Sequence, residues 1–392
     1  MTANGPMIPT HHARTRTLVP LQPLYALQKK TTKTCSPIPK ARSRLLQSPT
    51  QVESRTKCKT ELRQRHSNIN IPDLRVRGTG ATTLATMSSF PEEYKEPVHI
   101  AVIGGTGLQK LDGYEPVAIV NPKTPWGYPS APIHIVTHNS TPIAFLSRHG
   151  DSHEHAPHEV PSRANIAALR HLGVRTVIAF SAVGSLQEEI KPRDFVVPDQ
   201  IIDRTKGVRP FTFFEKGIVG HVGFADPFDD KIAQVVRECG HALAGEGVVL
   251  HDKGTIICME GPQFSTRAES HMYRSWGGSV INMSALPEAK LAREAEMVYQ
   301  MICMATDYDC WHSTADVDVA MVMGHMSANS KNAKLLVGAV LDKLSQAEHT
   351  DLVRGKHWEG VTTGFLKFIT KPEGRSDEAL ANVEYLFPGW LN

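Results

Sequence analysis

The sequence predicts an α/β domain with a mostly parallel sheet at its centre. Short apolar runs rich in β-branched residues alternate along the chain with segments whose apolar residues recur at helical spacing. Several of these apolar runs end at a glycine, where a strand can open into a loop. The composition agrees, because 41% of the residues are hydrophobic and 21% are charged. No stretch approaches the ~18 consecutive apolar residues that a membrane-spanning helix needs.

The apolar runs of the chain are the predicted strands. The first run, VHIAVI, stops at Gly104, and VRTVIAFSAV is a continuous apolar strand that ends in Gly184. The segment 194–203 is interpreted as a pair of strands or one bent strand. In order, we expect strands at 98–103, 132–138, 142–148, 174–183, 194–203, 253–260, 278–284 and 298–306.

The predicted helices lie between these runs. PSRANIAALRHLG has apolar residues at helical spacing and ends at Gly173, a residue type that suits the position just after a helix C-cap. LPEAKLAREAE consists of good helix formers throughout. The expected helices are 161–173, 229–245, 266–277, 286–296 and 317–346.

Residues 1–87 differ from the rest of the chain. They hold 15 Lys and Arg against 3 acidic residues, a net charge of +12, whereas the remainder carries −9. They lack sustained periodicity and have few aromatic residues, so they cannot bury enough apolar area to offset the entropy lost on ordering. We expect a disordered basic extension. Three interpretations stay open: a transit peptide, a basic arm that binds nucleic acid, or a gene-model extension upstream of a start at Met87.

We therefore expect residues 1–87 to be dispensable. A chain that begins at Met87 should keep the activity and the oligomeric state of the full chain, because the removed segment contributes nothing to a core. Steady-state rates and size-exclusion chromatography of the two proteins measure this. A large loss of either property on truncation would contradict the expectation.

Residues 98–392 are expected to form a single domain. The alternating pattern covers 98–346, and 347–392 either pack on that part or form loops.

The six cysteines stand far apart and form no CxxC pair, so neither a disulfide scaffold nor a zinc site is indicated, and a reducing compartment fits best.

Polar residues and glycines directly follow six of the predicted strands. Ligands of such folds bind beyond the carboxyl ends of the strands. Each group alone is a weak signal, since glycine turns and Asp pairs at helix starts are common. Together they combine glycine amides and hydroxyls with an arginine and a histidine, which suits an oxyanion such as phosphate. No Walker motif and no metal-ligand spacing accompany them. The groups stand at 104–107, 148–150, 181–185, 260–265, 283–284 and 306–309.

Seven sequence strings, in order between about 98 and 345, resemble the S-methyl-5′-thioadenosine phosphorylases, which belong to the trimeric branch of the purine nucleoside phosphorylase family; the fungal form is most similar. The strings are IGGTGL, SRHG, EVPSRANIAAL, SAVGSL, EGPQFSTRAES, VINMSALPEAKLARE and MATDYDCW. The resemblance implies a three-layer α/β sandwich with a central mixed, partly barrel-like sheet. It also implies a homotrimer with no cofactor and no metal, acting on small molecules without nucleic acid or membrane. The expected location is cytoplasm and nucleus, with mitochondrial targeting by 1–87 as the less favoured alternative.

The resemblance also assigns site residues. Met283 would lie against the ribose and Phe264 would stack on the purine. The base edge would be read by Asp307 and Asp309. His221 would reach into the site of a neighbouring subunit. The phosphate-binding residues would be Thr106, Arg148, His149, Ser181, Ala182 and Ser284, and the specificity region would comprise Ser265 together with Val317 and Met321, which would receive the methylthio group.

The implied reaction is phosphorolysis of the C1′–N9 bond of methylthioadenosine, giving adenine and 5-methylthioribose 1-phosphate. Asp307 is the candidate catalytic acid at N7. Because a free Asp has a pKa near ~3.9, its pKa must be raised by burial for it to donate a proton. Otherwise Asp307 accepts a hydrogen bond from an N7 that water has protonated.

The two aspartates of the TDYD string favour adenine over a 6-oxopurine as the base that the site recognises. An ionised carboxylate accepts a hydrogen bond from a 6-amino group but faces a lone pair on a 6-oxopurine. Strand alternation points Tyr308 away and puts Asp307 and Asp309 on one face. The simpler alternative is that the two aspartates cap a helix. The competing functions are a 6-oxopurine nucleoside phosphorylase of the same fold and a non-catalytic protein that binds adenine nucleosides.

Overall fold

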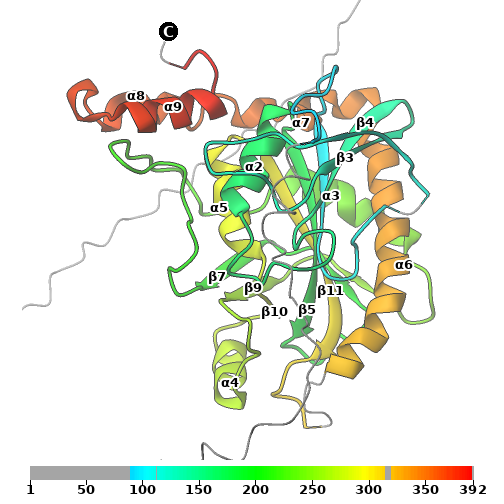
Figure 1. The fold of residues 1–392 in the computed structure, drawn as a ribbon. Helices are drawn as coiled ribbons and strands as arrows, with labels where there is room; N and C mark the ends of the chain where they lie inside the picture. The colour runs from blue at the N-terminus through cyan, green and yellow to red at the C-terminus, as the bar shows by residue number, and fades with distance from the viewer. Residues whose placement is uncertain (1–88, 112, 314–318, 391–392) are drawn as a thin grey trace, which may run out of the picture. The chain divides into compact units, whose positions relative to one another are not determined.

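A sheet of eleven strands forms the centre of the structure, a computed structural model that describes residues 89–111, 113–313 and 319–390 (Figure 1). The side chains of 319–323 and 367–369 lie outside this description, as does the prediction made for 1–87. The strands are β1 Ile100–Gly104, β2 Pro116–Val120, β3 Ile133–His138, β4 Thr141–Ser147, β5 Thr176–Ser185, β6 Phe195–Val196, β7 Gln200–Arg204, β8 Leu250–His251, β9 Thr255–Met259, β10 Val280–Asn282 and β11 Val298–Tyr308.

The pairing of these strands is mixed, with a parallel centre. β1 runs parallel to both β4 and β5, and β11 runs parallel to β5 along nearly its whole length. β3 and β4 form the predicted hairpin, β2 joins it antiparallel, and β10 pairs antiparallel with the end of β5. The main path runs from β2 to β7 without closing. The sheet is therefore mixed, as expected, but it is not a closed barrel.

Helices cover both faces of the sheet and complete the three layers. On one face, α2 packs against α5 and α9; on the other, α3 packs against α6. Figure 1 shows α2 and α5 on one side of β5 and β11, and α6 on the other. The helices are α2 Ser162–His171, α3 Asp230–Glu238, α4 Arg267–Ser275, α5 Ala285–Glu294, α6 Val319–Leu344, α7 Thr350–Val353, α8 Thr363–Ile369 and α9 Asp377–Leu386. None of these helices is both long and apolar enough to cross a membrane.

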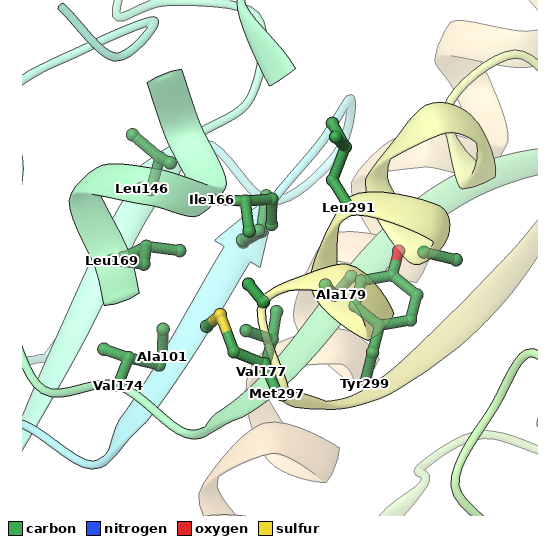
Figure 2. Close-up of a cluster of buried hydrophobic side chains, with 14 of the residues drawn as sticks. Ala101, Leu146, Ile166, Leu169, Val174, Val177, Ala179, Leu291, Met297 and Tyr299 are labelled. Carbon is green, nitrogen blue, oxygen red and sulfur yellow. The ribbon is translucent and has the colours of Figure 1, made fainter. Parts of the chain in front are cut away.

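The core on the α2 side shows how the apolar runs are used. Figure 2 shows Val177 and Ala179 of β5 near Ile166 of α2, Leu291 of α5 and Tyr299 of β11. All five side chains are at most 3% exposed. Because β5 is buried on both faces, its sequence is a continuous apolar run rather than an alternating one.

Local sequence signals fix the ends of several helices. After α2, Gly173 has φ +98°, its N–H donates to Arg170 O, and the N–H of Val174 donates to Leu169 O. These are the two hydrogen bonds of a Schellman motif, which confirms the predicted role of Gly173. Thr266 and Glu269 form a capping box at the start of α4. The helix expected over 229–245 was too long, because α3 ends at Glu238 and a single 3₁₀ turn follows.

The C-terminal part, for which the sequence assigned no structure, is helical and packs on the sheet domain. The carboxylate of Glu296 accepts hydrogen bonds from the backbone N–H groups of Gly360, Thr362 and Thr363 at 3.0, 2.8 and 2.9 Å, just before α8. Apolar residues of α9 join the same core as Phe213, Phe214 and Ile218. Two further hydrogen bonds tie this region to the loop before His221, from Val219 N to Thr370 and from Ser376 to the Lys216 carbonyl.

Candidate active site

A cavity of about 510 Å³ lies at the carboxyl ends of the central strands. It brings together nearly all the side chains that the sequence pointed to: Thr106, Arg148, His149, Ser181, Ala182, Phe264, Ser265, Met283, Ser284, Asp307 and Asp309. Three predicted residues are not among its walls. His221 is exposed on the loop between β7 and α3, Val317 lies outside the described residues, and Met321 belongs to α6 with its side chain outside the description.

One end of the cavity is lined by hydroxyl groups. Ser181 lies in β5 and Ser284 follows β10, and their Oγ atoms are 2.8 Å apart. The side-chain amide of Asn282, the last residue of β10, donates to Ser181 Oγ at 3.2 Å. Thr106 enters from the glycine loop after β1. Residues in or just after three strands therefore line one cavity with small hydroxyl groups, as the sequence suggested for an oxyanion site.

Arg148 lines this end, but much of its guanidinium is already engaged. Nε and Nη2 donate to the two carboxylate oxygens of Glu288, each at 2.8 Å, and Nη1 donates to Phe180 O at 2.7 Å. Tyr299 OH donates to the same Glu288 carboxylate at 2.7 Å. Arg148 and Glu288 are each 2% exposed. Arg148 thus lines the cavity with its guanidinium paired to Glu288, and its contact with phosphate stays a prediction.

The glycine loop after β1 is shaped around this arginine. A Cβ on Gly105 would lie 2.5 Å from Arg148 Nη1 and 2.8 Å from Phe180 O. Neither atom can retreat, since the guanidinium is held by Glu288 and the carbonyl belongs to β5. The second glycine of GGTG is thus required by a close approach.

His149 is a neutral ring in this setting. Its Nδ1 lies 2.9 Å from His155 O, and its ring stacks on His153 at 4.6 Å. Burial, and next the neighbouring charge of Arg148, lowers the pKa of His149 to about 4. At neutral pH this histidine brings no positive charge to the oxyanion end.

The other end of the cavity carries the two aspartates. The register of β11 against β5 shifts between Ala305 and Asp307, so a bulge lies at Thr306. Asp307 and Asp309 both face the cavity, while Tyr308 donates its OH to Glu188 O on the outside. The predicted sharing of one face is confirmed. In the described residues no helix begins at either aspartate, so the helix-cap alternative is wrong.

Burial makes both carboxyls easier to protonate. It raises the pKa of Asp307 to about 6, with Asp309 adding to the rise, against the hydrogen bond from Thr306 and the nearby His325. The pKa of Asp309 is also raised by burial, opposed mainly by Ser270. The sequence argument required a raised pKa at Asp307, and the structure supplies it through burial.

Arg209, a residue that the sequence did not indicate, supports the backbone at Met283. Arg209 forms a buried ion pair with Glu260, and its Nη1 donates to the carbonyls of Met283 and Leu286, each at 2.7 Å. Glu260 also accepts from Lys206 N at 2.6 Å. The turn carrying Met283 is thus tied to the end of β9 and to the loop after β7.

The residues that sequence reasoning missed act through others. Glu288 holds Arg148 and accepts a hydrogen bond from Tyr299. Asn282 holds Ser181, and Arg209 supports Met283. Glu288 stands in a segment of good helix formers, where a glutamate normally lies on the surface, so no local signal marks it as buried. Among the described residues, no group of three or more His, Cys, Asp or Glu is arranged to hold a metal ion.

Comparisons with known proteins show the family of this chain. Residues 99–342 match the family model described as the phosphorylase superfamily. A Sclerotinia sclerotiorum protein named S-methyl-5′-thioadenosine phosphorylase is 83% identical over 259 residues, covering 66% of this chain and 85% of that protein. A Fusarium vanettenii protein of the same name is 71% identical over 304 residues, covering 78% of this chain and 99% of that protein.

Solved structures give the same result. A methylthioadenosine phosphorylase from an antarctic soil metagenomic library superposes with a TM-score of 0.68 at 40% identity, covering 75% of this chain and all of that one. Methylthioadenosine phosphorylase from Schistosoma mansoni in complex with adenine gives 0.66 at 29% identity, covering 69% of this chain and all of that one.

Proposed function

Because the chain belongs to the phosphorylase superfamily, we infer that it catalyses the phosphorolysis of S-methyl-5′-thioadenosine to adenine and 5-methylthioribose 1-phosphate. It is a pentosyltransferase. The observation in this structure that carries the substrate is the pairing, in one cavity, of a hydroxyl-lined end with two buried aspartates. The two aspartates disfavour the first alternative, a phosphorylase of 6-oxopurine nucleosides. The hydroxyl-lined end disfavours the second, a protein that binds adenine nucleosides without catalysis.

We propose that phosphate occupies the hydroxyl-lined end, held by side chains that line the cavity there: Thr106, Arg148, His149, Ser181 and Ser284. Ala182, which also lines the cavity, completes the proposed phosphate-binding set. Cleavage leaves positive charge on the sugar, and a phosphate anion beneath the ring stabilises it. Fixing both reactants makes the attack effectively unimolecular, which lowers the barrier by up to about 7–11 kcal/mol in favourable systems.

At the other end, Asp307 protonates N7 of the departing adenine, and Asp309 accepts from the 6-amino group. A general acid of this kind contributes about 10²–10⁴-fold to the rate. With a pKa of about 6, Asp307 holds its proton in a usable fraction of molecules near neutral pH, which a free aspartate does not.

The direct test of the reaction is phosphate dependence. Purified protein should release adenine from methylthioadenosine with phosphate and release none without it, and inosine should be a far poorer substrate. Adenine release at the same rate with and without phosphate, or a preference for inosine, would overturn the proposal.

The pH profile tests the role of Asp307. A catalytic acid must be protonated in the free enzyme, so kcat/KM should fall as pH rises through about 6. If Asp307 worked only as an ionised acceptor, kcat/KM would instead rise through the same range. Stopped assays at saturating phosphate across this pH range measure the fall in kcat/KM. In the control variant Asp307→Asn this fall should be absent.

We propose that the protein works as a homotrimer, with His221 completing the site of a neighbouring copy. The loop that carries His221 exposes apolar side chains, with Val208 65%, Phe211 52% and Val219 47% exposed. Such a group favours a protein contact. Sedimentation of the purified protein at several concentrations tests the trimer.

We also propose a role in purine and methionine salvage, inorganic phosphate as co-substrate with no further cofactor or metal, and a location in cytoplasm and nucleus. Four cysteines of the described residues are unpaired thiols, Cys239, Cys258, Cys303 and Cys310, which suits a reducing compartment. Dialysis against a chelator should leave the rate unchanged, and a fluorescent fusion reports the location.

A further inference from the structure

Residues 219–228, here called the His221 segment, lead from the loop after β7 to the start of α3. The segment contains Gly220 and Gly223 and is irregular throughout, so its own sequence does not fix its shape. His221 is exposed, so packing does not fix its side chain either. The place of His221 therefore depends on the contacts that hold the backbone of the segment.

Arg293, near the end of α5, makes the main contact to this backbone. Its Nη1 donates to the carbonyl oxygen of Gly223 at 2.8 Å, and its Nη2 donates to that of Asp226 at 2.6 Å. Both nitrogens belong to one planar fork, so the two carbonyls are fixed relative to each other. The side-chain amide of Gln200 also donates to Ala225 O, at 3.2 Å, but that contact is exposed to water. The arginine, which is 7% exposed, therefore holds the segment more firmly.

The surroundings of Arg293 show that its charge is not there for packing. The guanidinium donates to carbonyl oxygens, and the ring centroids of Trp358 and Phe224 lie 3.8 and 5.9 Å from it. Burial lowers the pKa of Arg293, opposed by the charges of Asp229 and Asp226. Burying such a charge costs free energy that an apolar side chain of similar length would not cost. The presence of an arginine here is explained by the two carbonyls that it fixes.

Trp358 connects this arrangement to the start of α3. Its Nε1 donates to Asp229 Oδ2 at 3.0 Å, and His357 Nε2 lies 2.6 Å from the same oxygen. The other oxygen of Asp229 accepts from two backbone N–H groups in the first turn of α3 and so caps this helix. The His221 segment is thus fixed at its end by Asp229 and along its length by Arg293.

We propose that Arg293 is a positioning residue for the reaction: it holds the His221 segment in the shape in which His221 reaches the site of a neighbouring copy. This inference rests on the proposed function and on the proposed homotrimer. Arg293 is not among the residues that line the cavity of its own copy. Its loss should therefore impair the site of the neighbour and spare its own cavity, whereas a residue that only stabilised the fold would impair its own copy.

Mixed trimers of the full chain test this difference. Arg293→Met should lower kcat/KM for methylthioadenosine by about tenfold, because the segment is displaced. The variant Asp307→Asn with Asp309→Asn has an intact segment but an inactive cavity. When the two are co-expressed in equal amounts, about a quarter of the sites join an intact cavity to an intact segment, so activity should recover to about a quarter of that of the unaltered protein. If the two variants merely averaged, activity would be about one-twentieth.

Three further variants serve as controls. His221→Ala should recover with the aspartate variant in the same way, because its fault also lies in the segment. Arg237→Met removes another helical arginine, whose guanidinium donates to Asp252 and Asp230, and it should keep the kcat/KM of the unaltered protein. Arg293→Lys keeps the charge and the stem without the planar fork, so it replaces Arg293→Met in the same mixtures if the latter melts early.

A second readout needs no mixing. Since Arg293 acts through His221, Arg293→Met should change kcat/KM by less than about twofold when His221→Ala is already present. A full loss in that background, wild-type kinetics of Arg293→Met alone, or averaged activity of its mixture while that of His221→Ala recovers would overturn this inference alone. If the mixture with His221→Ala does not recover either, the proposed role of His221 fails and this inference with it. If the unaltered protein releases no adenine with phosphate, the proposed function itself fails.

Discussion

Replacing Asp307 and Asp309 together with asparagine is expected to lower kcat/KM for methylthioadenosine by about 10²-fold or more, on the scale of a lost general acid, with the fold intact. The two residues face the cavity and not the core, and Asn has nearly the volume of Asp. An amide cannot protonate N7, and it presents a donor where the 6-amino group needs an acceptor. The same donor suits a 6-oxopurine, so activity on inosine should rise.

Tyr308→Phe provides the matched control for the double variant. Tyr308 lies between the two aspartates in sequence but donates its OH to Glu188 on the outside. Its removal should leave kcat/KM near that of the unaltered protein. Assays of the three proteins with both nucleosides, together with their melting temperatures, separate recognition from folding. If the double variant kept wild-type kinetics, the aspartates would be structural and the choice of adenine would lose its main support.

Arg148→Ala is expected to have the largest effect on stability. It removes the partner of Glu288 and leaves a carboxylate that is 2% exposed, whose one remaining side-chain donor among the described residues is Tyr299. Breaking a buried pair from one side typically costs about 3–5 kcal/mol. Because the sequence assigns Arg148 to phosphate binding, the variant should also raise the phosphate KM. The structure adds a drop in the urea midpoint, since the arginine also holds β4 to α5 and, through Phe180, to β5.

A double variant separates these two roles of Arg148. Arg148→Met with Glu288→Met replaces the ion pair by apolar side chains of similar length, an exchange that is often close to neutral for stability. Urea unfolding should therefore show recovery relative to Arg148→Ala, while the phosphate KM stays raised because the cavity wall has lost its guanidinium. If Arg148→Ala unfolded at the wild-type urea midpoint, the buried pair would not contribute to stability as described.

The sequence predicted the strands of the sheet well because their signals are local. β5 is a continuous apolar run that ends in small polar residues, and its burial on both faces explains that pattern. The site could be predicted for the same reason: its residues stand in the second half of a strand or just after one, and these parts of neighbouring strands meet at one edge of the sheet. Thr106, Ser181 and Asp307 come from three strands and line one cavity.

The parts that could not be predicted depend on contacts distant in sequence. Glu288 is buried only because Arg148 lies 140 positions earlier in the chain and reaches it. β8 is two residues long, too short for a pattern, and exists through its pairing with β6. The helix expected to reach residue 245 is the exception, because it stops at Glu238 just before Gly240, a local signal that was available in the sequence. The burial of the apolar residues of α9 could not be predicted, because they pack against the loop at 213–218, which is distant in sequence.

The contacts between α9, Glu296 and the loop before His221 have a consequence for how this molecule opens. Segments linked in this way exchange their amide hydrogens as one cooperative unit, with an opening free energy below that of global unfolding. The N–H groups of Gly360, Thr362 and Thr363 all donate to the carboxylate of Glu296, and the N–H of Val219 donates to the Thr370 hydroxyl. These amides should therefore lose protection together, ahead of those in β5. The C-terminal helices and the loop leading to His221 are thus expected to open together.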